Sequence, residues 1–145
     1  MDENEFWQLI EECRPEGADE EGEELAQALV DRLSRGPVEL VTGFAEQLSR
    51  LLYQLDREEY GKEMSGDAFL YTRAAVVAAG RKVYESVLRD RVAFTPYAED
   101  DVWAESLLTV PDEAFRELTG EEWDRGTEYS YESFSNADGW PHLNG

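Results

Sequence analysis

Residues 66–90 read GDAFLYTRAAVVAAGRKVYESVLRD and contain the longest nearly apolar helical segment of the chain. Its centre, Ala74 to Ala79, reads AAVVAA and is apolar on every side of a helix. A helix that is apolar all round is normally buried at the centre of a bundle. We therefore expect one central helix here, with the other elements packed around it.

Two residues disturb this central segment. Gly80 costs about 1 kcal/mol relative to alanine inside a helix, so it predicts either a close helix contact or a local bend. Arg73 directly precedes the apolar run. If its guanidinium is covered, we expect a carboxylate partner, because an unpaired buried charge is strongly unfavourable.

Three amphipathic patterns before residue 60 predict further helices. Asp2 followed by Glu5 is a variant of the capping box, so the first helix is expected to start at Asp2. The apolar positions that repeat every three or four residues are Phe6, Leu9, Ile10 and Cys13, then Leu25, Ala28, Leu29 and Leu33, then Leu40, Val41, Phe44, Leu48, Leu51, Leu52 and Leu55. Residues 56–59 are expected to carry the chain back into solvent.

The chain after Asp90 predicts shorter elements. We expect a loop around Pro96, a short helix over residues 99–108, and another that opens at Pro111 and stops at Gly120. Residues 121–145 are polar but hold five aromatic rings, which disordered tails lack. The fold predicted is a single all-α domain of about five helices over 1–123, with an irregular aromatic C-terminal segment, 124–145, docked on it.

The charge balance restricts the partners. The 145 residues include 34 acidic and 13 basic side chains, for a net charge of −21. This charge opposes binding to nucleic acid or to an anionic membrane. Two interpretations of it stay open: a surface that only keeps the protein in solution, which is the commoner case, or one that steers a basic protein partner towards it. No apolar run approaches the roughly 20 residues of a membrane span. With one cysteine and an acidic start that does not resemble a secretory signal, we expect a cytoplasmic protein.

No residue pattern indicates catalysis. Cys13 and His142 are the only cysteine and histidine and lie 129 positions apart. We interpret Cys13 as a buried hydrophobe and His142 as too near the end of the chain to act as a rigid base. The glycines fit no phosphate-binding loop, and the carboxylates lack the spacing of a calcium loop. We expect no catalytic residue, metal or cofactor, and we lean against an enzyme.

One polar constellation could line a pocket between the central helix and the C-terminal segment. Its members are Arg73, Arg81, Tyr84, Tyr129, Tyr131, Asn136 and Trp140. A guanidinium flanked by aromatic rings suits an anionic or planar ligand. The competing interpretation is an arginine bridged to a carboxylate, with aromatic side chains that hold the C-terminal segment in place.

The chain resembles the DUF4240 family, small actinobacterial proteins of unknown function. The resemblance rests on Phe6-Trp7 with Leu9-Ile10, on DAFLYTRAAVVAAGRKVYESVL at 67–88, on LTGEEWD at 118–124 and on SYESFSNADGW at 130–140. It implies no activity. The leading hypothesis is therefore a non-enzymatic interaction or regulatory module that binds a basic protein, and the alternative is a small-molecule binder or enzyme that uses the constellation above.

Overall fold

The computed structural model describes residues 1–17, 19–124 and 126–144, and the side chains of these residues except 20 and 144. Within these ranges the protein is all-helical, as expected, with 69% helix and no strand. The α-helices are α1 (Glu3–Cys13), α2 (Glu23–Leu33), α3 (Val38–Gln54), α4 (Glu58–Gly61), α5 (Gly66–Ala78), α6 (Arg81–Arg89), α7 (Thr95–Glu99), α8 (Glu105–Leu108), α9 (Val110–Thr119) and α10 (Pro141–Asn144). Three short 3-10 segments, η1 (Glu20–Gly22), η2 (Arg91–Phe94) and η3 (Ala137–Gly139), complete the list. The expected number of about five helices is wrong, because the described chain forms ten.

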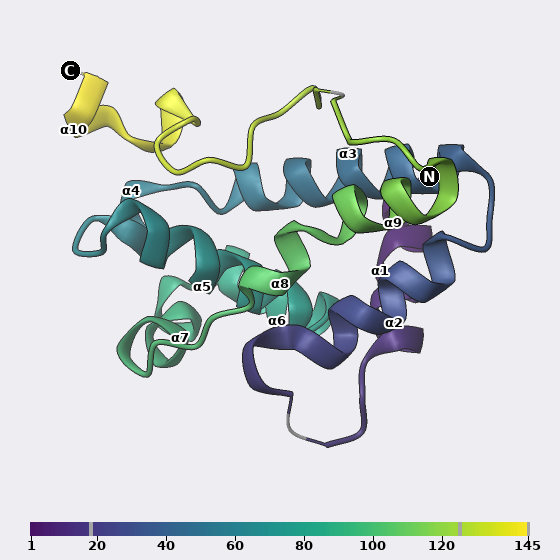
Figure 1. Ribbon diagram of the computed structural model, residues 1–145. Helices are drawn as coiled ribbons and strands as arrows, with labels where there is room; N and C mark the ends of the chain where they lie inside the picture. Colours follow the sequence, from purple (N-terminus) through teal and green to yellow (C-terminus); the bar gives the residue numbers. More distant parts are fainter. Residues whose placement is uncertain (18, 125, 145) are drawn as a thin grey trace.

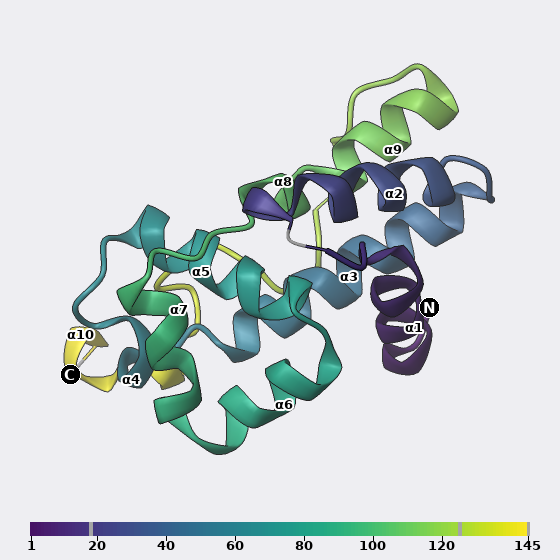
Figure 2. The ribbon, with the colours of Figure 1, turned by 90° about the horizontal axis from the view of Figure 1, so that it is seen from below.

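The 17-residue helix α3 is the longest element and contacts α1, α5 and α9. Its predicted apolar stripe is buried from Val41 to Leu52, and Leu55 continues it just past the helix end. Helices α1, α2 and α9 lie around the half of α3 that begins at Val38, and α4 and α5 lie towards the half that ends at Gln54 (Figures 1 and 2). The core therefore follows α3 along its length.

The expected central helix over residues 66–90 is two helices, α5 and α6, divided at Gly80. Gly80 has φ +104° and ψ 172°, a conformation that is open essentially to glycine alone. Of the two alternatives for Gly80, the local bend is confirmed. The first half keeps its predicted role, because every residue from Thr72 to Val77 is buried.

Two predicted helix ends are confirmed by their hydrogen bonds and backbone angles. Asp2 Oδ1 accepts a hydrogen bond of 2.8 Å from the backbone N–H of Glu5 at the start of α1. At the other end of the chain, α9 stops at Gly120, whose φ is +76°. Such a left-handed residue is the usual glycine stop after a helix.

The helix predicted over residues 99–108 is confirmed only for its last four residues, which form α8, and is wrong for residues 100–104. Helix α7 ends at Glu99 and α8 begins at Glu105, so residues 100–104 are not helical. The backbone N–H of Ala104 donates to the carbonyl of Tyr71 at 3.1 Å, which takes it out of a local helix and ties it to α5. Pro96, expected in a loop, lies in the first turn of α7, where a missing N–H costs nothing.

None of the helices in the described ranges has both the length and the apolar character needed to cross a bilayer.

Candidate functional site

The irregular chain after α9 returns along α3 in the same direction as that helix (Figure 1). The backbone N–H of Glu128 donates to Glu46 at 3.0 Å, and further along the rings of Tyr129 and Tyr53 lie 4.8 Å apart. We call residues 126–140 the C-terminal segment. Residues 125 and 145, which belong to the predicted segment 124–145, lie outside the described residues.

The C-terminal segment converges on the carboxylate of Asp56, which is fully buried just past the end of α3. Asp56 Oδ1 accepts from the Phe134 N–H at 3.0 Å and from the Trp140 indole Nε1–H at 2.8 Å. Asp56 Oδ2 accepts from the N–H groups of Ser135 at 2.7 Å and Asn136 at 2.9 Å. Hydrogen bonds to a charged acceptor are about twice as strong as neutral ones, so these four donors make Asp56 the anchor of the segment.

The path of the segment near Asp56 depends on a glycine and on an aromatic packing contact. A Cβ added to Gly139 would lie 2.6 Å from the backbone oxygen of Asp56, so only glycine fits without a shift of the main chain. Trp140 is 3% exposed and packs edge-on against Phe69 of α5 and against Phe134. Asp56, Phe69 and Trp140 thus join α3, α5 and the C-terminal segment.

Arg73 of α5 lies beneath the C-terminal segment and is fully buried. Its guanidinium donates to the carbonyl of Leu52 and to Ser133 Oγ, both at 2.9 Å, and it lies 4.6 Å from the centre of the Phe69 ring. Ser133 Oγ in turn donates to the carbonyl of Gly66 at 2.7 Å. The Nε–H of Arg73 has no hydrogen-bond partner among the described residues.

The electrostatics of Arg73 reflect this position. Burial lowers the pKa of Arg73 to about 10, while the carboxylates of Asp56 and Glu132 favour the charged form. The expected ion pair with a carboxylate is wrong for the described residues, since none has a carboxylate oxygen within 4.0 Å of this guanidinium. The guanidinium contacts the Leu52 carbonyl, the Ser133 hydroxyl and the face of the Phe69 ring instead of a carboxylate. The charges of Asp56 and Glu132 act on it from a greater distance.

The sequence analysis does not identify Asp56 as a functional residue. It was expected to lead the chain into solvent, and that expectation is wrong because it is fully buried. A signal was present: Asp56 lies four positions after Leu52 and so continues the buried stripe of α3. No local pattern shows which residues bind Asp56, because its hydrogen-bond donors lie 78–84 positions further along the chain.

The structure does not bring the seven predicted site residues together. Arg73, Asn136 and Trp140 lie close to Asp56 and its surroundings, and Asn136 Nδ2–H donates to the Tyr53 carbonyl at 3.3 Å. Tyr129 and Tyr131 lie further back along the C-terminal segment.

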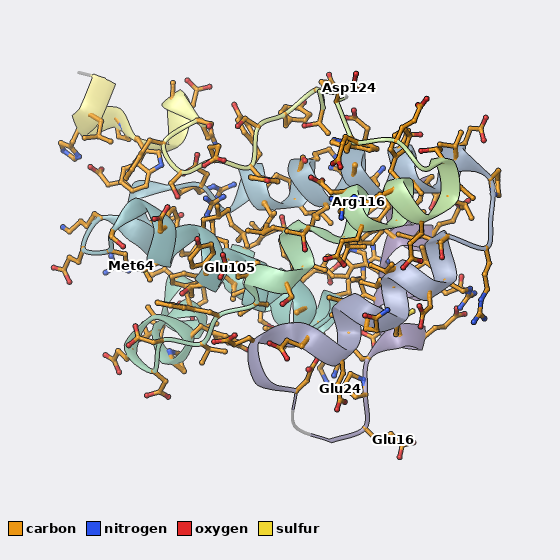
Figure 3. All side chains as sticks on the ribbon, viewed as in Figure 1. Glu16, Glu24, Met64, Glu105, Arg116 and Asp124 are labelled. Atoms are coloured by element: carbon orange, nitrogen blue, oxygen red, sulfur yellow. The ribbon has the colours of Figure 1, made fainter. Side chains whose placement is uncertain are left out.

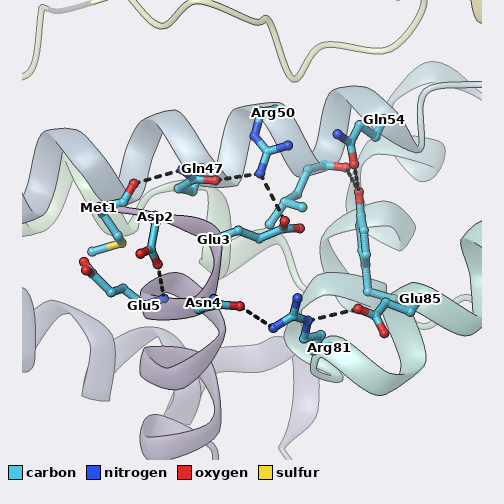
Figure 4. Close-up of polar contacts among 12 residues, drawn as sticks. Met1, Asp2, Glu3, Asn4, Glu5, Gln47, Arg50, Gln54, Arg81 and Glu85 are labelled. Atoms are coloured by element: carbon cyan, nitrogen blue, oxygen red, sulfur yellow. Dashed lines mark hydrogen bonds and ion pairs between the residues drawn. The ribbon is translucent and has the colours of Figure 1, made fainter.

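Arg81 and Tyr84 form a separate group on α6, in which Arg81 faces Asn4 of α1 (Figure 4) and Tyr84 contacts Leu51 of α3. Arg81 pairs with Glu85 at 2.9 Å and donates to Asn4 Oδ1 at 2.7 Å. The buried Tyr84 hydroxyl donates to the Leu51 carbonyl at 2.6 Å. These contacts link three helices, and they lie apart from the C-terminal segment.

A cleft of about 380 Å³ lies between the C-terminal segment and helices α3, α8 and α9. Its lining includes the buried Ser49 of α3, Asp112 of α9, and Trp123, Tyr131 and Glu132. Burial raises the pKa of the Asp112 carboxyl. Burial also raises the pKa of Tyr131, and the neighbouring carboxylates of Glu132 and Asp112 add to the shift. Of the seven predicted site residues, Tyr131 is the one that lines this cleft.

The single cysteine and the single histidine have separate surroundings. Cys13 is half-buried at the end of α1, and burial raises the pKa of its thiol, which disfavours the nucleophilic thiolate. His142 Nδ1 lies 2.5 Å from Glu58 Oε2, with the His142 side chain 85% exposed. Across residues 1–17, 19–124 and 126–144, no group of three or more His, Cys, Asp or Glu side chains could hold a metal ion.

The helical residues up to α9 match a known family. A family model described as "Protein of unknown function (DUF4240)" covers residues 1–117. The chain belongs to the DUF4240 family. No curated protein and no solved structure matches it.

The extent of the DUF4240 match divides the site in two. Asp56 and Arg73 lie inside the matched residues, whereas Ser133, Phe134 and Trp140, which bind them, lie outside. One part of the cleft lining likewise comes from the matched helices, and the other from Trp123 and from residues between 126 and 132. In this DUF4240 protein, both features therefore combine the matched helices with residues beyond them.

Proposed function

We propose that this DUF4240 protein is a non-enzymatic cytoplasmic interaction module that binds a basic protein partner through an acidic surface. The observation that carries the proposal is the distribution of charge. Residues 16–24 and 99–124 hold sixteen acidic side chains and one basic one, Arg116. We call the exposed acidic residues of these two ranges the acidic surface.

The two ranges meet in space through contacts of η1 and α2 with α8, and of α2 with α9. Figure 2 shows α2, α8 and α9 side by side, and Figure 3 labels Glu16, Glu24 and Glu105 on this side of the molecule. All three side chains belong to exposed residues. A patch of one sign raises the association rate of an oppositely charged partner and selects against partners of like charge.

The single basic residue of these ranges does little to neutralise the acidic surface. Arg116 Nη2 lies 3.4 Å from Glu122, and both side chains are more than half exposed. Exposed pairs of this kind contribute about 0–1 kcal/mol. The remaining carboxylates leave a strongly negative field that a basic partner would neutralise.

The test compares partner capture by the wild-type protein and by a variant of the acidic surface. The triple variant Glu16→Gln, Glu24→Gln and Glu105→Gln removes three charges without a change of shape. We expect about tenfold weaker binding of any partner captured near about 50 mM salt, since three lost pairs at about 0.5 kcal/mol each give that factor. Capture by the wild-type protein should itself fall towards about 500 mM salt, as the charges are screened.

The matched control carries the same change in net charge elsewhere. Glu5→Gln, Glu39→Gln and Glu63→Gln alter three exposed residues outside the acidic surface. This control should bind like the wild type. Equal losses in both triple variants would refute a localised surface, and capture that ignores salt, or no partner at low salt, would refute the proposal as a whole.

A further inference from the structure

The cleft between α3, α9 and the C-terminal segment has the dimensions of a ligand site. Its volume of about 380 Å³ falls within the roughly 300–1,000 Å³ usual for small-molecule pockets. Its walls come from Leu48 and Ser49 of α3, Leu108 of α8, Pro111 of α9 and the C-terminal segment. The cleft is therefore lined by packed helices and by irregular chain.

The walls of the cleft combine aromatic rings with carboxylates. Trp123 and Tyr131 supply the rings, and the Trp123 ring is held edge-on by Phe115 of α9 at 5.3 Å. Asp112 of α9 and Glu132 of the C-terminal segment supply the negative charges. Burial raises the pKa of Tyr131, and the charges of Glu132 and Asp112 add to this shift.

The described lining contains no lysine or arginine. Among the described residues, two arginines outside the lining act on these carboxylates. Arg116 acts on Asp112 but pairs with Glu122 at 3.4 Å, and the buried Arg73 acts on Glu132 from beneath. Two carboxylates beside aromatic faces oppose an anionic ligand and favour a positive group, which gains both from charge pairing and from the negative face of a ring.

We propose that this cleft binds a small organic cation, an ammonium group carried on an apolar body. The ammonium lies between Asp112 and Glu132, and the apolar body lies against Trp123 and Tyr131. This cleft shares Asp112 with the acidic surface, but its lining contains none of Glu16, Glu24 and Glu105, the three residues that test that surface.

The probe for this site is phenethylammonium, compared with two molecules of similar size, neutral 2-phenylethanol and anionic 3-phenylpropionate. Titrations of the full chain followed by ¹H–¹⁵N NMR include the Trp123 indole N–H as a reporter within the cleft. We expect phenethylammonium to bind with a dissociation constant on the order of 1 mM, as its few heavy atoms allow. Binding of 2-phenylethanol should be about tenfold weaker, and 3-phenylpropionate should cause no shift.

Two conservative variants locate the binding. Asp112→Asn and Glu132→Gln should each weaken phenethylammonium binding about three- to tenfold, since each removes one charge from the cleft. Glu113→Gln on α9 and Glu128→Gln on the C-terminal segment are the matched controls. Both change exposed residues outside the lining and should bind like the wild type. Circular dichroism checks that all four variants fold.

Three results would overturn the proposal: no binding by phenethylammonium in the millimolar range, equal binding of phenethylammonium and 2-phenylethanol, or equal losses in the cleft variants and their controls. Equal losses in the cleft variants and their controls would mean that phenethylammonium is attracted by the overall negative charge of the protein and does not bind specifically in the cleft. The triple variant of the acidic surface should leave the probe's affinity unchanged, so failure of this inference and failure of the proposed function are separable.

Discussion

Asp56 shows how one buried side chain determines the course of a distant segment. Replacement by asparagine keeps the size but turns one oxygen into an NH2 group. Each carboxylate oxygen accepts two hydrogen bonds, so either orientation of the amide leaves two partly or fully buried donors facing another donor. We expect Asp56→Asn to lower the free energy of unfolding by about 2–4 kcal/mol, as measured by urea denaturation.

The exposed Asp138 provides the control for this effect, because it belongs to the same stretch of chain. Asp138→Asn should change stability by no more than about 0.5 kcal/mol. Limited proteolysis adds a second readout, since Asp56→Asn should expose the C-terminal segment to cleavage before the helices. Equal stability of the two variants would contradict the anchoring role of Asp56.

Tyr84 should make the free energy of unfolding depend on pH. Burial raises the pKa of Tyr84, and the field of Glu3 adds to the shift. The stability that this tyrosine contributes is therefore fully present below about pH 10, its unfolded pKa, and is lost as the pH rises from there towards the folded value, by up to about 1.4 kcal/mol per unit. The free energy of unfolding should fall above pH 10, and Tyr84→Phe should make the fall less steep. An unchanged slope in this variant would contradict the assignment.

At the scale of elements, the break between α5 and α6 rests on one glycine. Gly80→Ala should lower the free energy of unfolding by about 2–3 kcal/mol, because its φ and ψ lie in a region closed to other residues. Gly120→Ala is the comparison, since Gly120 has an ordinary left-handed conformation with open space around it, and its cost should be about 1 kcal/mol. Thermal melts of both variants test the difference, and an equal or smaller loss at Gly80 would contradict it.

The elements also show what the sequence could and could not predict. Local patterns predicted the start of α1, the stripe of α3, the buried run in α5 and the stop after α9, because caps and apolar periodicity depend on neighbouring residues. The helix expected over 99–108 is interrupted because the backbone N–H of Ala104 donates to the carbonyl of Tyr71 on another element. The predicted grouping of the site residues is wrong for a similar reason. The sequence of a helix does not show which distant segment of the chain covers each of its faces. Arg73 contacts Ser133 of the C-terminal segment, whereas Arg81 contacts Asn4 of α1.

The whole molecule carries a net charge of −21. The mutual repulsion of its acidic side chains opposes the compact folded state. Added sodium chloride should therefore raise the melting temperature, most steeply below about 150 mM, where the Debye length is still above about 8 Å. Differential scanning calorimetry measures this, and the triple variants of acidic residues should show a smaller rise. A melting temperature that salt leaves unchanged would mean that local ion pairs balance the repulsion.

The anchoring of the C-terminal segment also sets the order in which the protein can mature as it is synthesised. Asp56 leaves the ribosome well before its four donors, which are encoded 78–84 codons later. Until those residues emerge, Asp56 lacks all four of these donors and Arg73 of α5 lacks Ser133. The nascent helices can gather early, but their last polar groups are satisfied only when residues 133–140 close over them, so translation itself times the final step of folding.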